Sequence, residues 1–378
     1  MKDLFHSIRP YNDKEAMVAI QDIFQKEEFV NALTLFEPYI SMQKVREEYL
    51  SYRSTYDFQL GVAKGFVDYF IHQTTAGVSL KGLENIQKDK AYLFVGNHRD
   101  IVFDTALLQY YFMVNRYATS RIAIGDNLLS HPLLEIIGKI NKMITVNRSL
   151  SLREKLANYK QMSEYIYYSI HQELQSIWIA QRNGRTKDGI DQTQQGLVKM
   201  FSMYHAKSPR EALAQLHIVP VTVSYEYEPC DKLKARELAL SENGVYEKTE
   251  GEDFESIKQG LFGQKGKVIL TIGTPLDREI SEITETDPKK IIEQVCLLID
   301  SQIFKNYHLF ASNYIAADYI ESSTQHARHY STTEKASFLN YIEKQSAIQD
   351  VPIDKMKNYL LHIYANPVKM VLEDLNKK

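Results

Sequence analysis

Short apolar segments of strand type alternate with helical segments through the middle of this chain. Five of the strand-like segments are "AYLFVG", "RIAIG", "KMITV", "SIWIAQ" and "KVILTIGTPL", and helical segments such as "TALLQYYFM" and "HPLLEIIGKI" lie between them. Strands that alternate with helices are typical of α/β folds, in which helices cover a sheet of largely parallel strands. The sequence therefore predicts an α/β domain with a mostly parallel or mixed sheet flanked by helices.

The segments before and after this region have a helical pattern. Near the N-terminus, "DKEAMVAIQDIF" places Met17, Ile20 and Phe24 on one helix face. Near the C-terminus, we expect the helical pattern to break at Asn366 and Pro367, because a residue that precedes proline disfavours the helical conformation. The predicted division is an N-terminal helical region over 1–76, the α/β domain over 77–284 and a C-terminal helical extension over 285–378.

Composition and charge exclude several classes of protein. Cys230 and Cys296 lie far apart, without histidines at ligand spacing, so we expect neither a disulfide framework nor a zinc site. The formal net charge of −3 gives no reason to expect nucleic acid as a partner. No stretch approaches roughly 18 uninterrupted apolar residues, and "MKDLFHSIRPYNDKE" lacks the apolar core of a signal peptide. We expect a cytoplasmic protein, soluble or at most peripheral to a membrane, with no bound metal or cofactor.

One long helix has a clear start signal. The segment "SLRE", Ser151 to Glu154, has the spacing of a capping box, in which the serine and glutamate side chains satisfy each other's backbone amides. The expected apolar stripe of this helix consists of Leu156, Tyr159, Ile166, Ile170 and Leu174.

A histidine directly follows one of the predicted strands. In "AYLFVGNHRDIVFD", His98 lies at the carboxyl end of the strand, where open α/β sheets bind ligands, and Asp100 and Asp104 follow it. A histidine there can remove a proton from a hydroxyl group, with a carboxylate fixing its tautomer. The alternative is that one aspartate only caps the next helix and His98 is a loop residue. This segment alone favours the alternative.

Three further loops add weight to the catalytic interpretation. "GKINKMITVNR" ends a strand-like segment on Arg148, and "WIAQRNGRTKDG" places Arg182, Arg185 and Lys187 around a glycine-containing turn. Arginine and lysine side chains at such positions can bind phosphate. In "IVPVTVSYEYEP", Pro220 lies within a strand, which predicts an edge strand or a bulge beside a pocket.

These four segments, in this order, resemble the conserved blocks of the glycerolipid acyltransferase superfamily. "VGNHRDIVFD" is similar to the first block, which has Asn-His followed by a catalytic Asp, and "KMITVNR" is similar to the second, which ends in Arg. "AQRNGRTKDG" resembles the third block, of Glu-Gly-Thr-Arg type, and "VPVTVSYE" the fourth. The resemblance covers about 78–276 and implies that the α/β domain is an acyltransferase domain.

Two departures from the family pattern affect the expected site. Five residues separate His98 from Asp104, where the family usually has four, so we prefer Asp104 as the partner of His98 and keep Asp100 as the alternative. In the third block, Asn183 replaces the usual glutamate, and Arg185 and Thr186 stand where Thr and Arg are usual. The lost negative charge beside an anion site is expected to alter the choice of acceptor before it alters the acyl-transfer chemistry.

The resemblance implies an enzyme of phospholipid biosynthesis that transfers an acyl group without a covalent enzyme intermediate. His98, oriented by Asp104, would activate a hydroxyl of glycerol 3-phosphate or lysophosphatidate for attack on acyl-coenzyme A or acyl-carrier protein. The residues expected to bind the acceptor are Arg148, Arg182, Asn183, Gly184, Arg185 and Lys187. Two alternatives remain open, a catalytically altered module that binds lipid or a membrane surface, and a thioester hydrolase.

Overall fold

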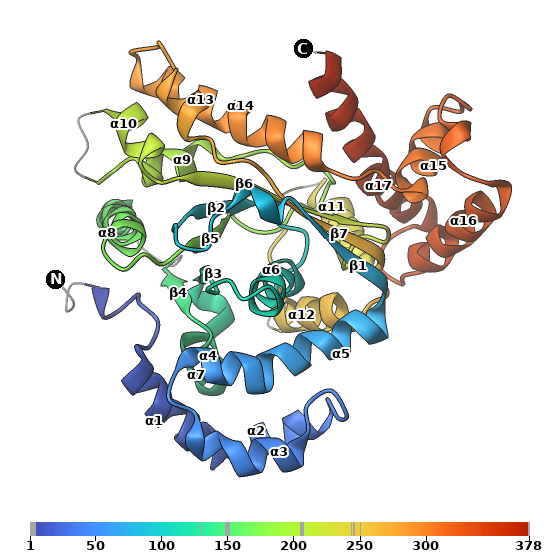
Figure 1. The fold of residues 1–378 in the computed structure, drawn as a ribbon. Coiled ribbons are helices and arrows are strands. Elements are labelled where there is room, and N and C mark those ends of the chain that lie inside the picture. Colours follow the sequence, from blue (N-terminus) through green and yellow to red (C-terminus); the bar gives the residue numbers. More distant parts are fainter. Residues whose placement is uncertain are drawn as a thin grey trace.

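Seven strands form one mixed sheet at the centre of the molecule (Figure 1). The computed structural model describes residues 5–129, 131–147, 152–204, 208–242, 244, 246–249 and 251–376. The strands are β1 (Thr75–Lys81), β2 (Leu93–Gly96), β3 (Arg121–Gly125), β4 (Met143–Val146), β5 (Ile177–Ala180), β6 (Ile218–Tyr225) and β7 (Gly266–Ile272).

The sheet has the strand order β1-β7-β6-β2-β5-β3-β4. The five strands from β6 to β4 are parallel, β7 is antiparallel to β6, and β1 is parallel to β7. The carboxyl ends of the five parallel strands therefore lie at one edge, where ligands bind in open α/β sheets. The predicted α/β fold with a mixed sheet flanked by helices is confirmed.

Helices cover both faces of the sheet and extend beyond its two sides (Figure 1). They are α1 (Asp13–Phe24), α2 (Glu27–Thr34), α3 (Met42–Glu48), α4 (Thr55–Phe58), α5 (Lys64–Thr74), α6 (Phe103–Val114), α7 (Pro132–Ile140), α8 (Leu152–His171), α9 (Gln195–Phe201), α10 (Pro209–Ala214), α11 (Asp231–Ser241), α12 (Glu252–Phe262), α13 (Asp277–Ser281), α14 (Pro288–Asn306), α15 (Ala311–Ile320), α16 (Thr332–Ser346) and α17 (Ile353–Asn376).

The sheet separates two hydrophobic cores. On one face, buried side chains of α8, α9, α10 and α14 pack against alternate residues of β2 and β5, such as Leu93 and Ile177. On the other face, α5, α6 and α12 pack against the intervening residues, such as Phe94 and Trp178. Successive strand residues point to opposite faces, which is why neighbouring residues of one strand belong to different cores.

The terminal regions form two smaller cores. Helices α1 to α4 share one cluster with Ile140 of α7, and α1 covers the segment in which a helix was predicted. Helices α11, α15, α16 and α17 share another. The division at 76 and 284 stays a prediction. Strand β1 begins at Thr75, and α14, which follows the second boundary, packs on the sheet itself.

The expectation of an edge strand or bulge at Pro220 is wrong. Strand β6 lies between β2 and β7, and Pro220 is paired with Val95 of β2. The carbonyl of Pro220 accepts a hydrogen bond from Gly273 N on the β7 side, just after β7 ends at Ile272. The N–H and C=O of a strand residue point to the same neighbouring strand. The N–H that Pro220 lacks would therefore face Gly273, which lies one residue beyond the end of β7, so no bond within the β6–β7 ladder is lost.

The expected helix break at Asn366 and Pro367 is also wrong. Helix α17 continues through Pro367. A proline inside a helix leaves the carbonyl four residues earlier without its usual donor, here that of Ile363. This carbonyl packs against Gly189, where an added Cβ would lie 2.3 Å from the oxygen and where φ is +82°. The irregular turn of α17 is therefore a contact site for the loop that contains Gly189.

Helix α8 confirms the predicted helix, although its apolar stripe is placed wrongly at three positions. Ser151, the first residue of the proposed capping box, lies outside the described residues. Ile166 and Ile170 are buried as expected, whereas Leu156, Tyr159 and Leu174 are exposed. In the described part of the chain, no helix is long and apolar enough to span a bilayer.

Candidate active site

Two loops meet at the carboxyl ends of β2 and β5. His98 follows β2 by two residues, and the loop that contains Arg182, Arg185 and Thr186 follows β5. The two strands are parallel neighbours, so their loops leave the sheet side by side. Thr186 N donates a hydrogen bond of 2.7 Å to His98 O, which joins the two loops directly. The first and third of the predicted blocks therefore form one structural unit.

Asp104, and not Asp100, contacts the ring of His98. Nδ1 of His98 lies 3.1 Å from Oδ2 of Asp104. The same oxygen accepts from the backbone N–H groups of Arg99 at 2.7 Å and Asp100 at 2.9 Å, and Oδ1 accepts from the hydroxyl of Tyr225 at 2.6 Å. Four donors around one buried carboxyl group are the surroundings that an ionised carboxylate requires. The Nδ1 proton then points to Asp104, and Nε2 is left as the basic nitrogen.

The extra residue between His98 and Asp104 is accommodated by a turn at Asp100. Oδ1 of Asp100 accepts from the backbone N–H groups of Val102 and Phe103, at 2.8 and 2.7 Å, and so caps the start of α6. An added Cβ at Gly260 of α12 would lie 2.2 Å from the second oxygen of Asp100. Asp100 therefore shapes the loop and contacts α12, while the longer loop still lets Asp104 reach His98.

The imidazole of His98 packs against the single tryptophan of the chain. The ring centroids of His98 and Trp178 lie 5.8 Å apart at an interplanar angle of 69°, and the side chain of His98 is 14% exposed. An added Cβ at Gly96 would lie 2.6 Å from Nε1 of Trp178, so only glycine leaves room for the indole at this position. Both rings lie on the sheet face that α6 and α12 cover.

A buried group of four charges lies directly behind His98. The guanidinium of Arg99, which is fully buried, pairs with Asp191 at 2.8 Å and Glu228 at 3.2 Å. Lys234 donates to Glu228 at 2.6 Å and to the carbonyl of Arg99 at 2.7 Å. Burial by itself lowers the pKa of Arg99, but the two carboxylates raise it well above its ordinary value. Two cations and two anions balance, which is the condition for burying them together.

This charged group also fixes the loop between β5 and α9, which contains the third block and is called the third-block loop below. Thr186, at the position where the family usually has arginine, is fully buried and donates to Asp191 at 2.7 Å. Lys187 forms an ion pair with Glu237 of α11. Asn183 is exposed, and its backbone N–H donates to Gln194 at 2.8 Å. Thr186 is neutral and Lys187 is already paired with Glu237, so neither offers an unpaired positive charge to an acceptor phosphate.

Two arginines of the same loop have nitrogen atoms without a partner among the described residues. These atoms are Nε of Arg182 and Nη1 of Arg185. Arg185 is 8% exposed and lines a small cavity of about 50 Å³ between α11 and α12. Gly184 between them adopts φ +74°, with nothing near the position of a side chain. Arg148, the other predicted cation, lies outside the described residues.

Helix α17 holds the far end of this loop. Asn366 donates to the carbonyl of Asp188 at 2.7 Å, and the N–H of Asp191 lies 3.1 Å from the sulfur of Met370. On the sheet side, Asp300 of α14 accepts from the backbone N–H of Thr193 at 2.8 Å and from its hydroxyl at 2.6 Å. Residues of the C-terminal region thus position a loop whose sequence lies more than 100 residues earlier.

Sequence reasoning missed four residues that lie around His98. They are Arg99, Trp178, Asp191 and Tyr225. Gln181, at the end of β5, is a further case, because it is fully buried and both polar atoms of its side chain lack a partner within the described ranges. The one available signal was a run of polar residues at strand ends, "NHRD" and "AQR", and it does not distinguish a buried polar residue from a solvated one.

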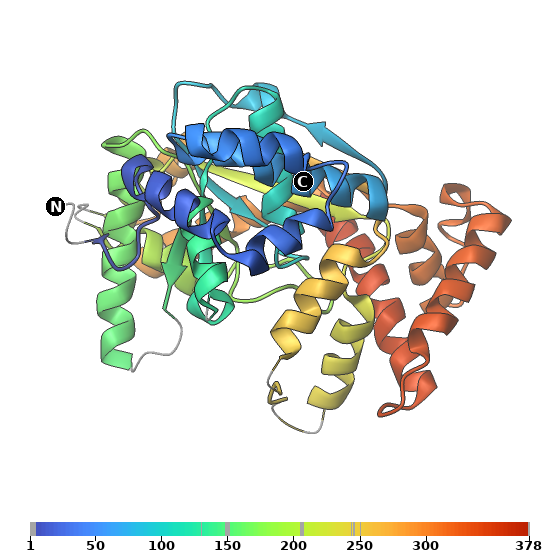
Figure 2. The same ribbon diagram turned by 90° about the horizontal axis from the view of Figure 1, so that it is seen from below.

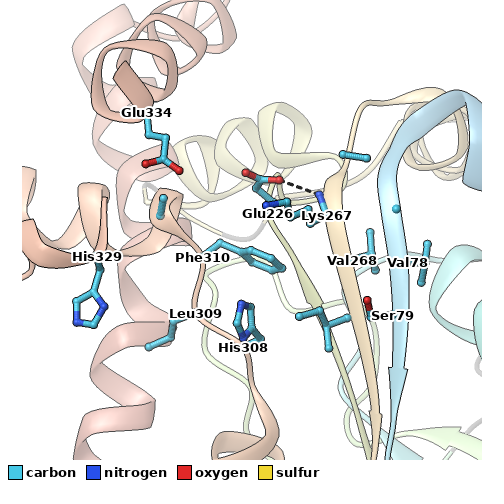
Figure 3. A pocket seen from close by; sticks show the side chains of 14 residues that line it. Val78, Ser79, Glu226, Lys267, Val268, His308, Leu309, Phe310, His329 and Glu334 are labelled. Carbon is cyan, nitrogen blue, oxygen red and sulfur yellow. Dashed lines mark hydrogen bonds between the residues drawn. The ribbon is translucent and has the colours of Figure 1, made fainter. Parts of the chain in front are cut away.

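A larger cavity lies elsewhere, between the sheet margin and the C-terminal helices (Figure 3). It has a volume of about 500 Å³ and is lined by β1, β7 and the segment from His308 to Ala311. Glu226 and Lys267 lie on its sheet side, and His308 and Phe310 on the other (Figure 3). In the part of the chain that the structure describes, no three His, Cys, Asp or Glu side chains are grouped as a metal site requires.

Comparison with known proteins identifies the class to which the central domain belongs. Residues 77–224 match the family model described as Acyltransferase, and this range contains His98, Asp104, the third-block loop and β6 up to Ser224. Residues 77–224 therefore match an acyltransferase domain, and the predicted recognition of this class is confirmed for that segment.

Among solved structures, the chain is similar to the 1-acyl-sn-glycerophosphate (LPA) acyltransferase PlsC from Thermotoga maritima, with 15% sequence identity over 74% of this chain and 91% of that one and a TM-score of 0.37. A comparison with curated proteins gives no match.

Proposed function

We propose that the protein transfers a fatty acyl group from acyl-coenzyme A or acyl-carrier protein to a hydroxyl of a glycerol-phosphate acceptor. Glycerol 3-phosphate and lysophosphatidate are the two acceptors that we favour. The observation that carries the proposal is the contact of 3.1 Å between His98 and Asp104, at a strand end inside the acyltransferase-family domain. A histidine oriented in this way has a basic nitrogen available for a substrate hydroxyl.

The proposed reaction needs only one base. Nε2 of His98 takes the proton of the acceptor hydroxyl while the oxygen attacks the thioester carbonyl carbon. A tetrahedral intermediate forms, and its carbon–sulfur bond then breaks. The departing sulfur takes the proton from the imidazolium and leaves as the free thiol of the donor. Asp104 stays ionised throughout and keeps the Nδ1 proton in place, so His98 returns to its starting tautomer.

Arg185 is the residue that we favour for binding the acceptor phosphate. Its Nη1 has no partner among the described residues, and Arg185 lines the cavity between α11 and α12. Arg182 is the second candidate, on the strength of its unpartnered Nε. A buried guanidinium gains a strong charge-assisted hydrogen bond from a phosphate and places the hydroxyl near the base. Arg148 keeps the role that the family resemblance gives it, and Asn183, Gly184 and Lys187 would shape the loop.

We further propose that the enzyme works in the cytoplasm and contacts the membrane peripherally when its acceptor is a lipid. Leu156 near the start of α8 and Phe254 near the start of α12 are 61% and 66% exposed. The first turns of these two helices point to the same side of the molecule (Figure 2). Exposed apolar side chains of this kind can enter the outer part of a bilayer without crossing it.

The decisive experiment is a screen of donors and acceptors. Purified protein is incubated with acyl-coenzyme A or acyl-carrier protein and with glycerol 3-phosphate, lysophosphatidate or glycerol, and the products are identified by mass spectrometry. We expect an ester of a phosphate-bearing acceptor and one free thiol per ester formed, with no product from the His98→Ala variant.

Each rival function gives a different result in the same screen. Free fatty acid without any ester would identify a thioester hydrolase. Binding of lipid without turnover by a folded protein would identify a lipid-binding module, and ester formation by His98→Ala at the wild-type rate would remove the proposed base.

A further inference from the structure

We propose that Tyr225 is a positioning residue for the base, because its hydroxyl holds the Asp104 carboxylate in the orientation that presents Oδ2 to His98. Tyr225 is the last residue of β6, and Asp104 is the second residue of α6. The inference rests on the proposed function, since it assigns a role within the same site. It concerns a residue that lies on a different strand from His98.

The hydrogen bonds of Asp104 divide cleanly between its two oxygens. Oδ2 contacts His98 and accepts from two backbone amides of the loop that follows His98. Among the described residues, Oδ1 has a single donor, the Tyr225 hydroxyl at 2.6 Å. The backbone amides fix where Oδ2 lies, and Tyr225 fixes the rotation of the carboxylate plane about it. Without the hydroxyl, a buried carboxylate oxygen would have no donor.

The surroundings keep the phenol of Tyr225 in its donating form. Burial raises the pKa of Tyr225 well above its ordinary value, and the neighbouring carboxylates of Asp104 and Asp100 raise it further. Glu228 adds to this effect from the segment after β6. Tyr225 is 1% exposed, so water does not compete for its hydroxyl. The phenol therefore donates to Asp104 across the pH range in which a histidine can act as a base.

Other charged or titratable groups face the pair from the remaining elements packed around it. Arg99 pairs with Glu228 of the segment after β6 at 3.2 Å, and Tyr307, which follows α14, stacks on the guanidinium of Arg99 at 5.2 Å. Lys265, which precedes β7, lies 4.7 Å from the ring of Phe103 beside Asp104. These groups are common to the wild type and to a Tyr225 variant. A change in pH dependence on removing the hydroxyl can therefore be assigned to the Tyr225–Asp104 bond.

Removing the hydroxyl has two expected consequences. The carboxylate of Asp104 can rotate, so His98 spends less time in the reactive orientation and kcat falls about tenfold or more, with the KM values of both substrates little changed. The carboxylate also loses one of its donors, which makes it a stronger partner for protonated His98. The acidic limb of the kcat/KM profile should therefore move to higher pH.

The test compares Tyr225→Phe with a matched control, Tyr341→Phe. Tyr341 of α16 also donates to a buried carboxylate at 2.6 Å, that of Asp231, but its partner is not Asp104. Both variants lose one hydroxyl from one carboxylate. We expect a lower kcat and an upward shift of the acidic limb for Tyr225→Phe, and a wild-type pH profile for Tyr341→Phe. Equal effects of the two substitutions, or an unmoved profile for Tyr225→Phe, would overturn the proposal.

A second measurement works without any substrate. NMR of the histidine ring nitrogens, with the signal of His98 assigned from its absence in His98→Ala, follows the protonation of His98 directly. Its titration should move to higher pH in Tyr225→Phe and stay at the wild-type position in Tyr341→Phe. If the wild type transfers no acyl group at all, the proposed function fails, while this titration still decides the role of Tyr225.

A substitution that preserves shape guards against loss of folding. Site-specific incorporation of 3-fluorotyrosine at position 225 keeps the hydroxyl and makes it a stronger donor. The acidic limb and the NMR titration should then move to lower pH, opposite to Tyr225→Phe. A shift in the same direction as Tyr225→Phe, or no shift, would contradict the positioning role.

Discussion

At the residue scale, the two aspartates near His98 make different contacts, and substitution can separate the roles that we propose for them. Asp104→Asn replaces an oxygen that accepts from His98 and two amides, so the ring loses its orienting acceptor. We expect kcat/KM to fall by about two to four orders of magnitude, the usual range for a general base. Asp100→Asn keeps an oxygen that can accept from Val102 and Phe103, so activity should stay within a few-fold of wild type.

Steady-state kinetics on both variants, with circular dichroism to verify folding, checks this prediction. A larger loss for Asp100→Asn than for Asp104→Asn would exchange the two roles. Full activity of Asp104→Asn would show that His98 needs no orienting carboxylate.

The same residues show what a sequence can and cannot predict about this site. The contact between His98 and Asp104 was predictable because a polar run follows an apolar strand and resembles a family block. Tyr225 was not, because a tyrosine at a strand end is typical of ordinary core packing. Its contact with Asp104 joins positions 121 residues apart, and nothing in the local pattern around either residue specifies it.

At the scale of single elements, the prediction concerns substitutions in the loop after β5. If Arg185 binds the acceptor phosphate, Arg185→Gln should raise the acceptor KM by roughly one to two orders of magnitude and leave the donor KM unchanged, since a charge-assisted hydrogen bond is worth about 1.5–3 kcal/mol. Lys187→Gln removes a cation from the same loop, but this cation already pairs with Glu237. Its effect on the acceptor KM should be much smaller.

Separate titrations of acceptor and donor for both variants give the answer. Equal losses for the two substrates in Arg185→Gln would indicate a structural arginine. A larger acceptor effect in Lys187→Gln would move the phosphate to the α11 side of the loop.

Element predictions failed where tertiary contacts outweighed a local rule. Pro367 should end a helix, but α17 continues with its buried side chains packed in the C-terminal core, and the carbonyl of Ile363, which lacks its usual donor, faces Gly189. Pro220 should mark an edge, but β6 is interior because the missing N–H falls beyond the end of β7. In both cases proline removes one backbone hydrogen bond, and the position of the affected backbone group in the fold decides how far this destabilises the element.

At the scale of the whole molecule, Asp300 should make stability depend on pH. Burial raises the pKa of Asp300 from its ordinary value of 3.8 to about 6, so the folded protein binds this proton more tightly than the unfolded chain. The stabilisation from the protonated form is complete below about pH 4 and is lost as the pH rises through about 6. Asp300→Asn cannot lose a proton, so its stability relative to wild type should increase over this window, by on the order of 1–3 kcal/mol.

Urea unfolding at pH 4, 5, 6 and 7 measures this difference. Asp318 of α15 provides a control of opposite sign, because its pKa is lowered, through hydrogen bonds from Tyr330 and Ser323 that outweigh the effect of burial. Asp318→Asn should lose stability relative to wild type as the pH rises toward about 4, a range that needs added points at pH 2 and 3, and the difference should then stay nearly constant from pH 4 to 7. A constant difference between Asp300→Asn and wild type across the window would show that folding does not raise the pKa of Asp300.

The class of the overall fold was predictable from the sequence, but the direction of two strands and the contacts of the C-terminal helices were not. Alternating strands and helices specify an α/β sheet, because each element must bury an apolar face. The reversal of β7 and β1 was not predictable, since the two-residue alternation that marks a strand is the same whichever way the strand runs. The contacts of α14 and α17 with the third-block loop were not predictable either, because they depend on how the C-terminal region folds back on the sheet.

The position of Trp178 gives the protein a built-in optical probe. It is the single tryptophan in 378 residues, and its indole lies 5.8 Å from the imidazole of His98. Emission excited at the red edge of indole absorption therefore comes from one place, and a protonated imidazole quenches indole more strongly than a neutral one does. Stopped-flow fluorescence of the unlabelled protein can thus follow the arrival of each proposed substrate and the order in which the proposed donor and acceptor bind.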